Sequence, residues 1–383
     1  MTPVGVFGIL LGLLAYPICS IAKTRRHIGI FAAIFVIHVS AAFYYHYWAQ
    51  TNTTDSTLYF FDPYGFYGEG FAGGTGFVIS MVQFLKETIG GTYLDYFLLF
   101  QASGIWAMAF MMRVLEETYT EVGREPPAIT YLPLFFPSLH FFTSSIGKDG
   151  PLVLAAAMMV WCIMNIRRRL IPFGIALWIM VLFRPHIALV AALAFTITLF
   201  FDPRTKPLIR FGLGFVAIMA LGVIAGTVQQ SFGVDVTSAE SVGGFFERQS
   251  RTAQQFDTGT SVIGASYPVR LLSLLFRPFF FDANSLLSLL ASLENVFTVA
   301  FAIVLFRRRR DVVMLYRQVF FIRFATMFAL MLTLLLAYVY YNVGLGLRQR
   351  TMILPGLLAC FGAILAVQHA RLNPAPGLRA ASA

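Results

Sequence analysis

The sequence predicts an all-α, polytopic membrane protein that forms a single transmembrane helical bundle over residues 1–383. Three observations support this fold class. First, 58% of the residues are hydrophobic and only 12% are charged, which leaves more apolar surface than a soluble core could bury. Second, apolar runs of about 20 residues, long enough to cross a bilayer as a helix, recur along the chain. Third, lysines and arginines cluster in alternate gaps between these runs, as in proteins with one cytoplasmic face.

About eleven apolar segments are predicted to cross the membrane. In chain order they are 3–21, 28–48, 94–115, 127–144, 151–166, 170–185, 186–201, 211–228, 285–306, 321–341 and 351–368. The long run from 170 to 201 is predicted as two short spans because Arg184, Pro185 and His186 interrupt it. The first segment is predicted to be a retained span, since no basic leader precedes it and no small-residue cleavage site precedes Lys23.

Charge distribution predicts the orientation of the chain. Most of the 28 lysines and arginines fall on the same side as Lys23, Arg25 and Arg26, and the positive-inside rule makes that side cytoplasmic. The N-terminus is therefore expected outside and the C-terminus inside. Two long loops, at about 49–93 and 229–284, are then extracytoplasmic, and within them 77–88 and 267–281 are expected to form helices lying in the membrane interface.

Composition also argues against several kinds of site. The net charge of +10 comes from basic residues at the ends of apolar segments, where they meet lipid headgroups, so nucleic acid is not an expected partner. Cys19, Cys162 and Cys360 lie in apolar segments without metal-ligand or disulfide-framework spacing. The 6 histidines show no HxxxH or HExxH pattern, so no metal site and no cofactor is predicted, while an Asp- or Glu-bound divalent cation stays open.

The first outer loop carries candidate catalytic carboxylates among aromatic residues. Asp55, Asp62 and Glu69 are candidate bases, because a carboxylate held at the membrane surface among aromatic rings can have a raised pKa and deprotonate a sugar hydroxyl. Tyr64 and Tyr67 are candidate sugar ligands, since aromatic faces pack on sugar rings. The alternative is an ordinary aromatic belt with solvated acids.

A second candidate region is the stretch from 135 to 150. His140, in the outer half of a span, is a candidate sugar ligand, and Lys148 is a candidate phosphate ligand in the turn before the next helix. The positive charge of Lys148 and the backbone N–H groups that start this helix would both attract phosphate. The alternative is a neutralised pair of Lys148 with Asp149.

Four arginines on the outer side are candidate ligands of a lipid diphosphate: Arg184, Arg277, Arg348 and Arg350. Snorkelling to headgroups explains any single arginine near the membrane, but two Arg-Pro pairs and an Arg-x-Arg on one side favour forked contacts to a diphosphate. Glu294, inside a predicted span, is expected to pair with one of these arginines.

Three stretches of the chain, FPSLHFFTSSIGKDG, FRPFFFDANSLLSLLASLE and YNVGLGLRQRTMILP, resemble motifs of a known family. They are similar to those of bacterial integral-membrane polysaccharide polymerases and related glycosyltransferases of the GT-C superfamily, the Wzy-like and EpsG-like proteins. The resemblance implies a GT-C-like fold, polyprenyl-linked oligosaccharide donors and acceptors, and a site on the outer face of the bacterial cytoplasmic (inner) membrane. A chain-length regulator or a flippase is a further candidate partner.

Carried onto this sequence, the resemblance makes Lys148, Arg277, Arg348 and Arg350 phosphate ligands and Asp62 or Glu69 the base. One feature departs from the superfamily pattern. Its acidic loop usually follows the first span of a chain whose N-terminus is inside, whereas here the acidic loop follows the second predicted span. The choice among the three candidate acids is therefore open.

The expected function is a glycosyltransferase that polymerises or transfers sugars linked to polyprenyl (di)phosphate in surface-polysaccharide assembly. The alternatives are a single-sugar polyprenyl-phosphate-dependent transferase, a polysaccharide ligase, and a flippase or transporter of lipid-linked sugar. A transporter should need polar residues near mid-membrane and gates on both faces, whereas the polar residues of this sequence concentrate on one side.

Overall fold

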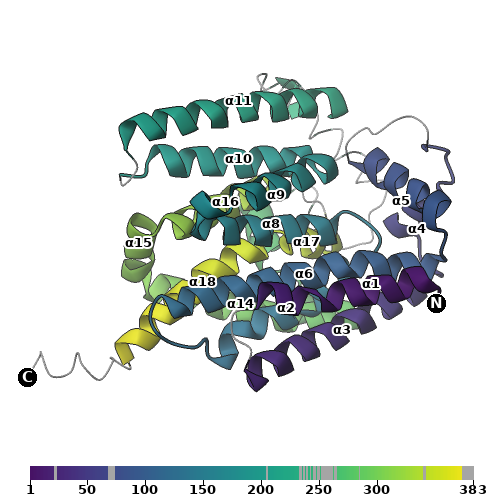
Figure 1. Cartoon of the computed structure of the whole chain (residues 1–383), viewed down its shortest axis with the longest axis horizontal. Helices are drawn as coiled ribbons and strands as arrows, with labels where there is room; N and C mark the ends of the chain where they lie inside the picture. The colour runs from purple at the N-terminus through teal and green to yellow at the C-terminus, as the bar shows by residue number, and fades with distance from the viewer. Residues whose placement is uncertain are drawn as a thin grey trace, which may run out of the picture.

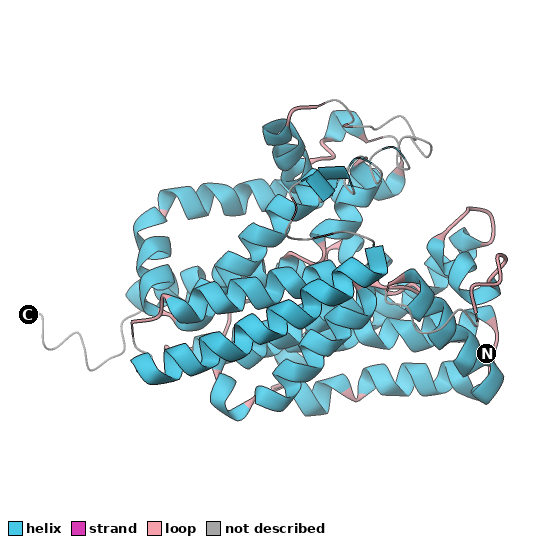
Figure 2. Ribbon diagram, turned by 90° about the horizontal axis from the view of Figure 1, so that it is seen from above, coloured by secondary structure: helices cyan, strands magenta, loops and turns pink. Residues whose placement is uncertain are grey.

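Helices make up 83% of the computed structural model, and no strand occurs among the residues that the structure describes. These residues are 1–20, 24–67, 74–203, 206–232, 265–283, 285–339 and 342–372, with isolated positions between 235 and 262. Figure 2 shows the bundle from above, with its helices joined mostly by short loops. The predicted all-helical class is thus confirmed.

The first half of the chain contains α1 (Pro3–Leu13), α2 (Ala15–Cys19), α3 (Arg25–Ala49), α4 (Asp55–Phe61), α5 (Thr75–Ile89), α6 (Tyr93–Thr120), η1 (Ala128–Phe135), α7 (Pro137–Thr143), α8 (Asp149–Met164) and η2 (Ile166–Arg168). The second half contains α9 (Leu170–Phe183), α10 (Pro185–Phe200), α11 (Pro207–Phe232), α13 (Tyr267–Phe276), η3 (Phe280–Asp282), α14 (Leu286–Arg307), α15 (Arg309–Gln318), α16 (Phe320–Val339), α17 (Val343–Arg350) and α18 (Leu354–Leu372).

Among the residues that the structure describes, five helices, α3, α6, α14, α16 and α18, are long and apolar enough to cross a membrane. Shorter apolar helices pack beside them: α8 contacts α6, α10 contacts α16, and α9 packs against α8 and α10. These helices indicate a membrane protein, while the predicted number of spans stays a prediction. The predicted break at Arg184 is confirmed, since α9 ends at Phe183 and α10 begins at Pro185.

One predicted span is not a single helix. Residues 127–144 form the 3-10 helix η1 and the short α-helix α7, and Phe136 between them is extended, with ψ of 121°. Proline explains the break, because Pro137 disfavours a helical conformation at the preceding residue and supplies no backbone N–H. The segment predicted as one span is therefore built of two helices, and its crossing of the membrane stays a prediction.

Most of the long helices run along the long axis of the molecule, which gives the bundle two distinct ends (Figure 1). At one end, which we name the loop end, lie residues 1–2, α4, α5, the 144–148 turn and α17. At the other, which we name the basic end, Arg26 donates to the carbonyl of Pro126 at 2.7 Å, and Arg169 pairs with Glu117 at 2.8 Å.

Helix α6 is the central helix of the bundle and packs against α1, α3, α8 and α18. Its contact with α1 is close because glycine faces it: a Cβ on Gly8 would lie 2.2 Å from the carbonyl oxygen of Leu98. Gly5 and Gly12 lie on the same face of α1, so a seam of small residues lets the two backbones approach. This packing holds α1 and the start of α6 together at the loop end.

Candidate functional site

Charged residues from four distant parts of the chain meet at the loop end. Asp55 begins α4, Lys148 and Asp149 stand at the start of α8, Arg184 separates α9 from α10, and Arg348 lies in α17. We name these five residues the loop-end cluster. Each part contributes a helix end or the loop beside it, so the cluster forms only when the bundle packs.

Arg348 is the centre of the loop-end cluster. Its Nη1 donates to Oδ2 of Asp55 at 2.5 Å, and its Nε donates to Oδ2 of Asp149 at 2.5 Å. The two carboxylates differ in exposure: the side chain of Asp149 is 2% exposed, whereas that of Asp55 is 48% exposed. Arg348 therefore neutralises a buried acid on one side and reaches an accessible acid on the other.

Arg184 approaches the same buried acid from the opposite side. Its Nη2 lies 3.6 Å from Oδ1 of Asp149, an oxygen that accepts no hydrogen bond from the described part of the chain. The Arg184 side chain is only 15% exposed. Two guanidinium groups thus share one buried carboxylate, which leaves N–H donors for a further anion.

Lys148 is the third cation of the cluster. Its Nζ donates to Oγ1 of Thr75 at 2.7 Å, and it forms no ion pair with a carboxylate of the described residues, Asp149 included. Burial lowers the pKa of Lys148 to about 7, and the neighbouring charge of Arg184 acts in the same direction. The side-chain amine of Lys148 is therefore poised to gain a proton, and so become an ammonium, when an anion binds beside it.

The pKa of Asp55 reflects opposing influences. Burial acts to raise it, but the charge and hydrogen bond of Arg348 outweigh burial and hold the pKa below its usual value. Asp55 is consequently ionised at neutral pH and a weak base while Arg348 holds it. With Lys148 protonated, the cluster contains more cations than carboxylates, which suits an anionic ligand.

No protein-family model, curated protein or solved structure matches this chain. Its site is therefore interpreted from its own geometry.

The other candidate bases lie apart from the cluster or outside the described residues. Asp62 ends α4 with φ of 44°, and its two carboxylate oxygens accept from the backbone N–H groups of Phe66 at 2.9 Å and Tyr67 at 2.8 Å. This geometry makes Asp62 a turn-stabilising residue. Glu69 lies outside the described residues.

The two candidate sugar-stacking tyrosines lie on the surface of the first loop. Tyr64 is 75% exposed, and Tyr67 donates its hydroxyl to Oε2 of Glu87 at 2.7 Å. Among the described residues, neither tyrosine forms a hydrogen bond or a ring contact with the loop-end cluster. Their role as sugar ligands stays a prediction.

Two of the four predicted arginine ligands bind acids elsewhere. Arg277 makes a forked contact with Asp282, with distances of 2.8 and 3.0 Å. Arg350 lies 3.5 Å from Oε2 of Glu294 and also hydrogen-bonds Asn295. The expected pairing of Glu294 with one of these four arginines is confirmed, and Arg350 is the partner.

Glu294 also accepts hydrogen bonds from the first residues of α7. It accepts from the backbone N–H and from the hydroxyl of Ser138, both at 2.6 Å. The first N–H groups of a helix have no partner within the helix, and the break before α7 makes that of Ser138 available. The proline that divides the predicted span thus creates a binding point for a buried acid.

His140 is buried and lies beside a second buried histidine. Its Nδ1 lies 3.1 Å from Nδ1 of His38, whose Nε2 lies 3.1 Å from the carbonyl oxygen of Gln101. Because a carbonyl only accepts, neutral His38 donates through Nε2 and accepts from Nδ1 of His140. His140 is 1% exposed, so a role as a sugar ligand would require the bundle to open.

Sequence reasoning missed the function of Asp149 within the cluster. It considered Asp149 only in the alternative of a neutralised pair with Lys148, but the structure pairs Asp149 with Arg184 and Arg348. The sequence holds a partial signal, because an acid at the first position of an apolar helix needs a partner. It does not indicate which cation supplies the contact.

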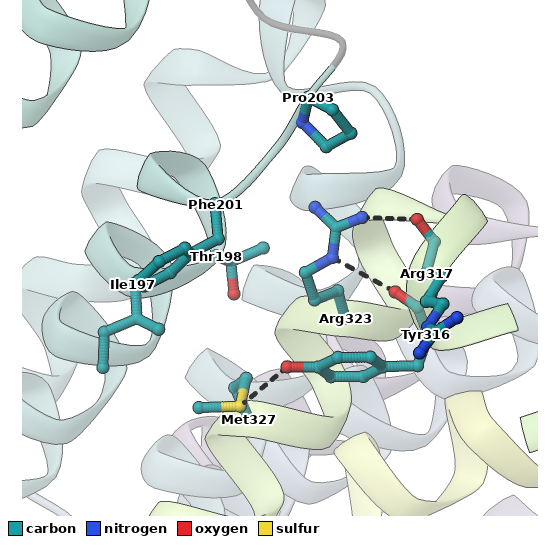
Figure 3. Close-up of a pocket in the computed structure, with 8 residues that line it drawn as sticks. All are labelled: Ile197, Thr198, Phe201, Pro203, Tyr316, Arg317, Arg323 and Met327. Carbon is teal, nitrogen blue, oxygen red and sulfur yellow. Dashed lines mark hydrogen bonds between the residues drawn. The ribbon is translucent and has the colours of Figure 1, made fainter. Parts of the chain in front are cut away.

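A separate cavity of about 380 Å³ lies at the basic end (Figure 3). Arg323 projects into it, but its donors are used by the carbonyls of Tyr316 at 3.1 Å and Arg317 at 2.6 Å. It also pairs with Asp202 at 3.4 Å. Arg323 therefore closes the end of α15, and the loop-end cluster is the better candidate for chemistry.

Among the described residues, no group of three or more His, Cys, Asp or Glu could hold a metal.

Proposed function

We propose that this chain is a membrane glycosyltransferase that polymerises or transfers sugars linked to polyprenyl (di)phosphate. The observation that carries the proposal is the convergence of Lys148, Arg184 and Arg348 at one end of a membrane bundle. A lipid diphosphate presents its charge just outside the hydrocarbon, at the depth where such a cluster would meet it. Two forked guanidinium groups and an ammonium are suited to bind it.

The cluster would accelerate transfer by stabilising the leaving group. The acceptor hydroxyl oxygen bonds to the anomeric carbon, the bond from that carbon to the diphosphate oxygen breaks, and negative charge grows on the diphosphate. Fixed cations placed where this charge develops lower the barrier, and removal of one such donor typically costs about 100- to 1,000-fold in rate.

Asp55 is the candidate base that lies within the cluster. A bound diphosphate would compete with Asp55 for Arg348, and loss of that contact would raise the pKa of the carboxylate. Asp55 would then accept the proton of the acceptor hydroxyl as the new bond forms. Donor binding and base activation would in this way share one arginine.

A second candidate function is transport of a lipid-linked sugar. The observation that favours it is the buried polar network of Glu294, Asn295 and Arg350 inside the bundle, since transporters place polar groups there. This network is closed by its own hydrogen bonds, whereas the loop-end cluster retains unused donors.

The test uses cells that lack the protein, complemented with wild type, Arg348→Ala, Lys148→Ala or Asp55→Asn. We expect each variant to shorten the surface polysaccharide and to accumulate lipid-linked single repeats on the outer face. Arg168→Ala, an exposed arginine at the basic end, is the matched control and should give wild-type chain lengths.

Protein level and detergent monodispersity are measured in parallel, because Arg348→Ala leaves Asp149 with one fewer partner. Wild-type chain lengths in well-folded Arg348→Ala and Lys148→Ala variants would refute the cluster as the donor site. Lipid-linked sugar that accumulates on the cytoplasmic face, shielded from impermeant periodate, would identify a transporter instead.

A further inference from the structure

Four consecutive arginines form a pocket at the basic end. Helix α14 ends at Arg307 and α15 begins at Arg309, and a cavity of about 320 Å³ is lined by residues 307–311 and Arg371. The only acid in this lining, Asp311, is paired with Arg371 at 2.8 Å. Among the described residues, no carboxylate lies within ion-pair distance of residues 307–310. We name this cavity the arginine pocket. It concentrates positive charge and has room for an anion.

An apolar groove adjoins the arginine pocket. A cavity of about 740 Å³ lies between α13 and α14 and is lined mainly by apolar side chains. Those that form its walls are Val269, Leu272, Phe276, Val299, Ile303 and Phe306. Arg307 lines both this groove and the arginine pocket. The two cavities therefore adjoin at the last residue of α14.

Helix α15 places the junction at a membrane surface. Its Leu315 is buried against the bundle, whereas Arg310 and Arg317 are exposed. A short helix with one apolar and one basic face lies in the plane of the interface. The arginine pocket is thus at headgroup depth, and the groove extends from it along a helix long enough to cross the membrane.

We infer that the arginine pocket and the groove together bind one anionic phospholipid of the bilayer. Its phosphate contacts residues 307–310, and an acyl chain lies in the groove. Charge complementarity selects an anionic headgroup, and basic clusters beside transmembrane helices attract such lipids. A free phosphate would leave the groove unused, and a neutral lipid would leave the arginine pocket unused. The site lies at the opposite end from the loop-end cluster and does not depend on the proposed function.

The experiment titrates the purified full chain in detergent with dioleoylphosphatidylglycerol or dioleoylphosphatidylcholine and counts bound lipids by native mass spectrometry. Wild type should retain the anionic lipid preferentially. Arg308→Gln/Arg310→Gln should weaken that retention by about 30-fold, as expected for two charges near a membrane surface. Arg167→Gln/Arg168→Gln removes two exposed arginines from the same end and should leave retention unchanged.

Two further arms test the groove and the source of the phosphate. Ile303→Trp, which fills the groove, should lower retention of the anionic lipid, and inorganic phosphate at the same concentration should fail to displace it. Equal retention of both lipids by wild type, or an unaffected Arg308→Gln/Arg310→Gln variant, would overturn the inference. Full displacement by inorganic phosphate would also overturn it, because the arginine pocket would then bind a free anion.

Discussion

Arg348 illustrates how one side chain can serve both folding and binding. Its contact with Asp149 neutralises an acid that is almost fully buried, and a buried carboxylate without a partner is costly. Its contact with Asp55 faces the accessible side of the cluster, where the carboxylate is exposed. A ligand can therefore replace the second contact without breaking the first.

Lys148 gives the cluster a predicted pH dependence. Because its pKa in the free protein is about 7, the ammonium form is present below that pH and is lost as pH rises. Anion binding that requires the charge should weaken above pH 7, approaching tenfold per pH unit for one proton.

The measurement is the dissociation constant of inorganic pyrophosphate for the purified full chain from pH 6 to 9. Lys148→Arg keeps its charge over this range and is the matched comparison, since the titration of pyrophosphate itself is common to both proteins. Identical profiles for wild type and Lys148→Arg would show that Lys148 does not contact the anion.

Individual helices position the site through close packing and through breaks. The glycine face of α1 lets α6 approach, and α6 in turn supports α3 and α8. The break between η1 and α7 gives Glu294 its backbone donor, and the break between α9 and α10 places Arg184 beside Asp149. In each case a local interruption supplies a polar contact that a continuous helix would not offer.

Gly8→Ala should destabilise the bundle, because the new Cβ would overlap the backbone of Leu98 and push α1 from α6. Overpacking of this kind typically costs about 1–3 kcal/mol. The check is thermal unfolding in one detergent beside Gly29→Ala, whose Cβ would meet nothing within 4 Å. Gly29→Ala should be neutral or slightly stabilising, and an equal loss in both variants would argue against the α1–α6 contact.

At the scale of the whole molecule, the two ends differ in the charged residues they hold. The loop end holds mixed charges from distant segments, and the basic end holds arginines in short connections. Positive charge favours the cytoplasmic side, so the candidate catalytic site should face outward.

Cysteine labelling in intact cells tests this orientation. Asn52→Cys, exposed at the loop end, should react with an impermeant maleimide from outside, and Arg168→Cys only after permeabilisation. The native Cys19 and Cys162 are buried and should contribute little background. Reversed labelling would place the loop-end cluster in the cytoplasm, where an outward-facing polymerase could not work.

The positions of most helices and breaks follow from the sequence, because they depend on which residues lie near one another along the chain. Apolar runs predict the long helices, Arg184 and Pro185 predict a break, and the polar turn before α8 predicts a cation at a helix start. Proline could have predicted the break before α7 as well, but the hydropathy of 127–144 favoured one span. For Glu294, the sequence predicted that an arginine is the partner but not which one.

The sequence by itself thus determined the helical membrane class, most helix positions and the types of charge available. Only the tertiary structure decided which charges meet. Arg348 and Arg350 were predicted to bind one ligand, yet residues two apart on an α-helix point about 200° apart around its axis. Arg348 therefore reaches Asp55 and Asp149, and Arg350 reaches Glu294. These partners are separated by many helices in the chain, and packing alone brings them together.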